Sequence, residues 1–134
     1  MGGKPEIVRD GEGVAVDPHG DSLIIQLNEN NNVRFVRFPL AGGKEQPLSF
    51  SDVRPATTPI AANAVAPNGT ILKNANYSDS WVWNVALLHP DTGKSQRIIL
   101  PSLDVQSAGW TPTGQIFVFA ARTNSTIWRL RPTR

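Results

Sequence analysis

Short apolar runs separated by polar turns extend along the whole chain. Arginines interrupt the apolar positions of residues 33–40 (VRFVRFPL) and 126–132 (TIWRLRP), which we interpret as the period-two alternation of strands. Residues 81–90 (WVWNVALLHP) place apolar side chains on both faces of a strand. We find no window of 11 to 18 residues with apolar positions at helical spacing. The pattern therefore predicts an all-β chain.

A longer repeat organises these runs. Residues 13–27, 62–75 and 107–121 each contain an apolar strand, an x-Pro-x-Gly turn and a second apolar strand. The turn prolines Pro18, Pro67 and Pro112 are 49 and 45 residues apart. Proline sets a φ of about −65° early in a turn, and the glycine two residues later accepts a positive φ. We therefore expect three tight hairpins at the spacing of four-stranded propeller blades.

The segments between the hairpins predict the remaining strands. A polar loop follows each hairpin, then a third strand, and a Gly-Lys turn leads to fourth strands at 44–50 and 94–100. We expect one domain, 1–134, that is a β-propeller segment of about three four-stranded blades. Residues 1–10 form an outer strand, 11–50 blade one, 51–100 blade two, and 101–134 a third blade that lacks its outer strand. A sandwich or barrel would also fit the short strands, but the long repeat favours a propeller.

The recurrence of GGK predicts how the chain assembles. Residues 2–4 repeat the turn of residues 42–44, so the chain begins in an outer strand whose blade is missing. Propellers have four to eight blades, and an open arc would leave sheet edges unpaired. We expect residues 4–8 of one copy to pair beside residues 127–130 of another, so that a homodimer closes a six-bladed ring by strand exchange. The alternatives are a piece of a longer propeller, or another oligomer.

The third repeat carries a family resemblance. AGWTPTGQIFVF (108–119), followed by STIWRLRP (125–132), resembles the WSPDG-type repeats of TolB-like bacterial propellers. The family usually has Asp before the turn glycine, where this chain has His19, Asn68 and Thr113. The resemblance implies a C-terminal propeller segment, which in such proteins follows a sensor, a kinase or a winged-helix module. It specifies the fold and hardly constrains function.

Composition narrows the possible partners. The chain has 134 residues, which predicts a single folded domain, and it has no cysteine, so the compartment stays undetermined. The net charge is only +2, and the arginines of residues 129–134 fit the solvated face of a strand. We therefore expect no nucleic-acid partner. No apolar run reaches the roughly 18 residues of a membrane span, so no membrane association is expected either.

The sequence offers few residues that could act in catalysis. The two histidines, His19 and His89, both lie beside prolines in turn-like contexts, and we see no phosphate-binding loop. We expect no catalytic residue, no cofactor and no metal.

One segment keeps an enzymatic alternative open. ANAVAPNGT (62–70) is loosely similar to a segment of gluconolactonase-like propellers, and this likeness implies a cation ligand at Asn63, with Asp17 and Asp104 as possible carboxylates. The Asp that follows the Asn in that family is Ala64 here. We prefer the interpretation that Asn63 caps the start of a strand.

An aromatic loop gives the ligand-binding hypothesis. Tyr77 and Trp81 lie in or beside the polar segment 74–80, which begins with Asn74. Exposed aromatic rings with amide neighbours can bind a carbohydrate or a peptide. We predict Asn63, Asn74, Tyr77 and Trp81 as ligand-binding residues, and we assign the other tryptophans to packing between blades. The predicted function is a non-enzymatic binding or scaffold module with its ligand on the loop rim or in the channel. The alternatives are a metal-dependent lactonase-like hydrolase, or the truncated sensor arm of a larger bacterial regulator.

Overall fold

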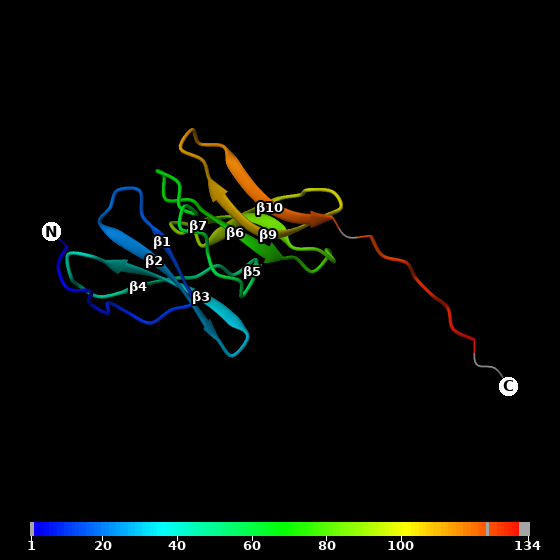
Figure 1. The fold of residues 1–134 in the computed structure, drawn as a ribbon, viewed down its shortest axis with the longest axis horizontal. Helices are drawn as coiled ribbons and strands as arrows, with labels where there is room; N and C mark the ends of the chain where they lie inside the picture. Colours follow the sequence, from blue (N-terminus) through cyan, green and yellow to red (C-terminus); the bar gives the residue numbers. More distant parts are fainter. Residues whose placement is uncertain (1, 123, 132–134) are drawn as a thin grey trace.

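A computed structural model describes residues 2–122 and 124–131. The described residues form ten strands and no helix, arranged in three antiparallel sheets (Figure 1). The all-β prediction is confirmed. Within these ranges, no helix is long and apolar enough to cross a membrane.

The sheets follow one another along the chain. The first contains β1 (Gly13–Val16), β2 (Ser22–Glu29), β3 (Asn32–Pro39) and β4 (Gln46–Leu48), in that order. The second contains β5 (Arg54–Pro55), β6 (Ile71–Asn76), β7 (Asn84–His89) and β8 (Lys94–Ile98), also in order. The third contains only β9 (Leu103–Trp110) and β10 (Ile116–Arg122). The fourth strands expected over 44–50 and 94–100 are present as β4 and β8.

Local sequence sets the hairpins. β2 and β3 pair over eight positions, and Asn30 and Asn31 between them have φ values of 48° and 65°. Asparagine tolerates positive φ, and two such residues in succession form the turn whose twist matches that of the strands. Strand register therefore follows from the turn.

Two of the three clusters of the core lie on either side of the second sheet, and the third, which includes Ile25 and Val36, lies on the first sheet. Ile71 and Leu88 face a cluster shared with the first sheet, which includes Ile24 and Phe35. Leu72 and its neighbours face a second cluster shared with the third sheet. Side chains alternate across a strand, so a strand buried on both faces needs apolar residues at successive positions. The two-faced pattern predicted for residues 81–90 is thus explained by a sheet that lies between two others.

The first strand of the second sheet differs from the expectation. We predicted a strand leading into the turn at Pro67, but only a single bridge joins Val65 to Ile71. β5 lies earlier in the chain and pairs with the other end of β6. Residues 56–64, between β5 and the bridge at Val65, form an irregular segment, because polar side chains from β2 and β6 hold its backbone, as described below.

The two terminal strands are not formed in the described chain. Residues 2–12 contain no strand; Arg9 pairs with Glu45, and the amide of Glu12 donates to Gln26 O at 3.0 Å. This segment lies along the first sheet, at the opposite end of the molecule from residues 127–130 (Figure 1). Residues 4–8 and 127–130 of one chain therefore do not pair with each other, and the pairing expected between two copies stays a prediction.

The third strand expected over 126–132 is also missing. Residues 124–131 are irregular and lead away from the sheets (Figure 1), and residue 132 lies outside the described residues. The third sheet consequently has two strands instead of three. A strand forms only where its backbone finds a partner and its apolar face finds a cover, and in this chain the tail has neither.

Candidate functional site

The three predicted turns have the same hydrogen bonds. In each, the amide of the glycine donates back to the residue before the proline: Gly20 to Asp17 at 2.8 Å, Gly69 to Ala66 at 2.8 Å, and Gly114 to Thr111 at 3.0 Å. The glycines have φ values of 75°, 81° and 80°. These angles lie in the region that residues with a Cβ resist, which explains why glycine recurs at this position. The predicted turn mechanism is confirmed.

The turns converge on one pocket of about 940 Å³. Pro18, Pro67 and Pro112 all line it, each carried by a different sheet. Further apolar lining comes from Val16 on β1, Leu87 on β7 and Trp110 on β9, and from Val65 and Ala66 just before the turn at Pro67. Segments almost 50 residues apart in sequence therefore build a single concave surface.

Asn63 connects two walls of this pocket. Its side-chain Nδ2 donates to Trp110 O at 2.7 Å, and the amide of Trp110 donates to Asn63 O at 2.9 Å. A Cβ at Gly109 would lie 2.4 Å from Asn63 Oδ1, so the contact requires glycine there. Asn63 lines the pocket, but its amide is used to join the second sheet to the third.

Polar groups surround the apolar lining. The carboxylate of Asp17 accepts from the amide of His19 at 3.0 Å and from Ser22 Oγ at 3.3 Å, so it stabilises its own turn. Asn68, His89 and Thr111 contribute further polar atoms. This arrangement can hold an apolar group and hydrogen-bond to its polar neighbours.

The residues of the lactonase hypothesis are not gathered. Asp17 and Asn63 line the pocket, whereas Asp104 does not; its Oδ1 accepts from the amide of Trp83 at 2.9 Å. Among the described residues, no group of three or more His, Asp or Glu side chains is placed to hold a metal ion.

A second polar cluster lies beneath the irregular segment 56–64. Lys73 on β6 is 2% exposed, and its Nζ donates to Thr58 O, to Thr58 Oγ1 at 3.3 Å and to Asn74 Oδ1 at 2.9 Å. From β2, Gln26 Nε2 donates to Thr57 O at 3.2 Å and to Thr58 O at 3.1 Å. No described carboxylate pairs with Lys73, and burial lowers its pKa from 10.5 to about 8. The cluster fixes the backbone of residues 57 and 58 and so replaces the strand that we expected.

The aromatic-loop residues do not form a joint site. Asn74 is buried: its Oδ1 accepts from Lys73 and Thr58, and its Nδ2 donates to Val105 O at 3.1 Å. Tyr77 is half-buried beneath the guanidinium of Arg97, which lies 4.7 Å from its ring centre. Trp81 is completely exposed. Of the four predicted residues, only Asn63 lines the large pocket.

This pocket was not predicted from the sequence, although most of the residues that line it belong to the repeat. The x-Pro-x-Gly repeat that predicts the hairpins also supplies the prolines of the lining, but the convergence of the turns depends on how the sheets pack. Comparison of the chain with family models, with curated proteins and with solved structures finds no match.

Proposed function

We propose that the chain is a β-propeller segment that acts as a non-enzymatic binding module, with its ligand in the pocket of the three turns. The observation that carries the proposal is the convergence of three repeated turns on one large, apolar concavity. Two consecutive four-stranded sheets with their strands in chain order support the finer fold assignment. A third, partial sheet begins with the same turn.

The lining favours a peptide ligand. A volume of about 940 Å³ is within the range of small-molecule and side-chain pockets. Proline rings and the indole of Trp110 offer rigid apolar surface that loses little conformational entropy on binding. Backbone and side-chain polar groups of the turns lie beside it and can pair with peptide amides. An extended peptide with at least one large apolar side chain matches both features.

The first sheet provides a matched pair of variants for the test. Val16 and Val14 lie two residues apart on the same face of β1, and both are about half exposed. Val16 lines the pocket and Val14 does not. Peptides would be selected from a random display library on the wild-type chain, and their affinities measured by calorimetry. V16E places a charge in the apolar lining and should weaken binding by about tenfold or more, while V14E stays within about twofold of wild type.

Two outcomes would overturn the proposal. One is that the library yields no enriched peptide on the folded chain. The other is that V16E and V14E bind an enriched peptide equally well, which would place the ligand elsewhere.

A further inference from the structure

The three sheets have six outermost strands, and five of them are protected against pairing with another chain. The free edge of β9 is used by the amides of Val105 and Trp110, which donate to Trp83 O at 3.0 Å and to Asn63 O at 2.9 Å. β1 is covered by residues 60–62, where the amide of Val16 donates to Ala62 O at 3.2 Å. β4 and β5 have three and two residues, and each contains proline. β8 carries lysine and arginine. Short length, proline and charge are the usual means by which natural sheets block edge-to-edge pairing.

β10 has none of these protections. It is seven residues long, contains no proline, and has no charge before Arg122. β9 pairs with one edge, and within the described residues no strand pairs with the other. Ile116, Val118 and Ala120 face the core cluster shared with the second sheet, while Phe117 and Phe119 are 63% and 65% exposed on the opposite face. This edge therefore has the composition of a strand inside a sheet.

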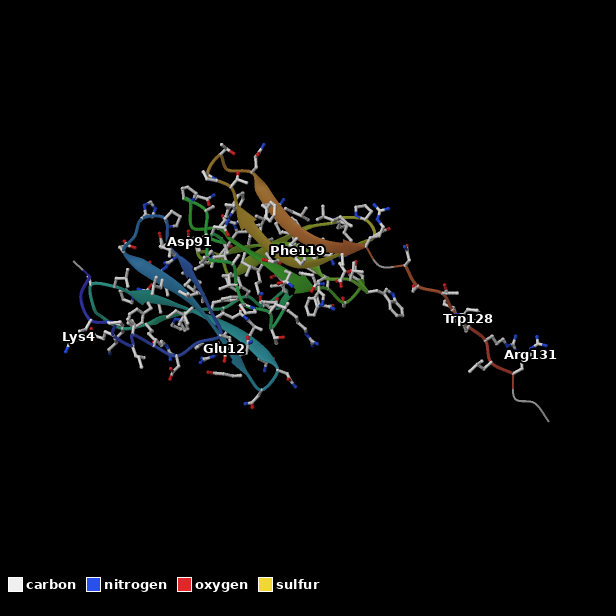
Figure 2. All side chains as sticks on the ribbon, in the orientation of Figure 1. Lys4, Glu12, Asp91, Phe119, Trp128 and Arg131 are labelled. Carbon is white, nitrogen blue, oxygen red and sulfur yellow. The ribbon has the colours of Figure 1, made fainter. Side chains whose placement is uncertain are left out.

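The tail, residues 124–131, has the composition of a missing neighbour. Its residues 126–131 combine β-branched, aromatic and basic side chains, which favours a strand. Ile127, Trp128 and Leu130 are between 82% and 97% exposed. In Figure 2 the labelled Trp128 and Arg131 point into open space far from Phe119 on β10.

The connection between β10 and the tail sets a register. Three residues, 123–125, separate the two segments, and a three-residue loop would pair position 122 with 126. Val118 then lies opposite Leu130, and Ala120 lies opposite Trp128, on the face that covers the core. In the same register Arg129 lies opposite Phe119 on the outer face. Trp128 and Leu130 thus meet the core, while Arg129 and Arg131 meet solvent together with Ile127; the opposite alternation would turn both arginines of the tail toward the core.

We propose that β10 of one copy pairs with residues 126–131 of a second copy, and that the exchange is reciprocal. Exchange keeps the contacts of the hairpin and makes them between chains. A second copy is the occupant we choose because the tail leads away from its own β10, which leaves that edge open to the tail of another chain. The proposal does not depend on the ligand of the turn pocket.

Disulfide trapping tests the proposal cleanly, because the chain has no cysteine. One preparation carries F119C and another, with a different tag, carries R129C. Directly opposed residues in antiparallel strands have Cα atoms about 4.5 to 5.5 Å apart, which a disulfide spans. We expect a mixed disulfide dimer after the two preparations are combined and oxidised. The control pair, F119C with L130C, has its side chains on opposite faces and should give at least about fivefold less product.

Two further measurements complete the test: the mass of the chain in solution, and a check for pairing of the tail with β10 of its own chain. Light scattering of the wild-type chain should give twice 14.6 kDa. L130D should raise the dissociation constant by about tenfold or more, because the substitution places a charge against the core face. A chain that carries both F119C and R129C distinguishes the alternatives. A disulfide within one chain at monomer mass would overturn the exchange in favour of fold-back, and a wild-type monomer without any cross-link would overturn the pairing altogether.

Discussion

The burial of Lys73 predicts how the free energy of unfolding changes with pH, and by how much. Its pKa falls from 10.5 to about 8 on folding, because burial without a carboxylate disfavours the charged amine. Between these values the unfolded chain holds a proton that the folded chain has released. The free energy of unfolding therefore rises with pH through this window, and below about pH 8 the contribution is absent.

The magnitude is worked from the two pKa values. Each unit of difference corresponds to 1.36 kcal/mol, so the full window contributes about 3 kcal/mol. Between pH 7.5 and pH 9.5 the free energy of unfolding should rise by about 2 kcal/mol. For a chain of this size that corresponds to an increase of about 1 M in the urea midpoint.

Urea unfolding followed by tryptophan fluorescence at the two pH values is the assay. K73M removes the titrating amine, while Thr58 O keeps the hydrogen bond from Gln26 and Thr58 Oγ1 keeps the one to Asn74. The variant should lose the rise with pH. K94M changes an exposed lysine on β8 and should retain it. If the free energy of unfolding depended on pH equally in wild type and K73M, the claim that the buried amine loses its proton on folding would be refuted.

Three further substitutions test the packing. G109A forces the side chain of Asn63 from its hydrogen bond to Trp110 O and should lower the free energy of unfolding by about 1 to 3 kcal/mol, measured by urea denaturation. The double variant N63A/G109A should recover part of this loss, and the absence of any recovery would contradict the close approach of Gly109 to Asn63. F35A removes a ring that is 1% exposed between the first two sheets and should cost about 3 to 5 kcal/mol in the same assay. W81A removes a fully exposed indole and should stay within about 0.5 kcal/mol, and a larger loss would show that this ring packs against a neighbour.

The hairpins could be predicted from sequence because their causes are local. Proline and glycine at fixed offsets determine the backbone of the turns at Pro18, Pro67 and Pro112, whatever surrounds them. The apolar run over 81–90 likewise indicates two buried faces. Such signals need no knowledge of the rest of the chain.

The remaining features depend on contacts between distant segments. Lys73 lies in a strand (ILKNAN) in which the sequence predicts a solvent-facing lysine. It is buried instead, because Thr58, 15 residues earlier, accepts hydrogen bonds from its amine. The same contact removes the strand expected before Pro67. The pocket also arises from packing, because nothing in one turn indicates where the other two lie. Strands over residues 1–10 and 126–132 were predicted from the repeated GGK turn and from the alternation of apolar residues with arginine, whereas a strand also requires a partner edge.

The central claim is that three turns distant in sequence form one ligand site. The most direct test is a ¹H–¹⁵N correlation spectrum of the chain, titrated with a peptide enriched from the display library. We predict that the amide signals of Gly20, Gly69 and Gly114 shift together with a single dissociation constant, along with the indole signal of Trp110. Shifts confined to the loop of Tyr77 and Trp81, with the three glycines unchanged, would contradict the account.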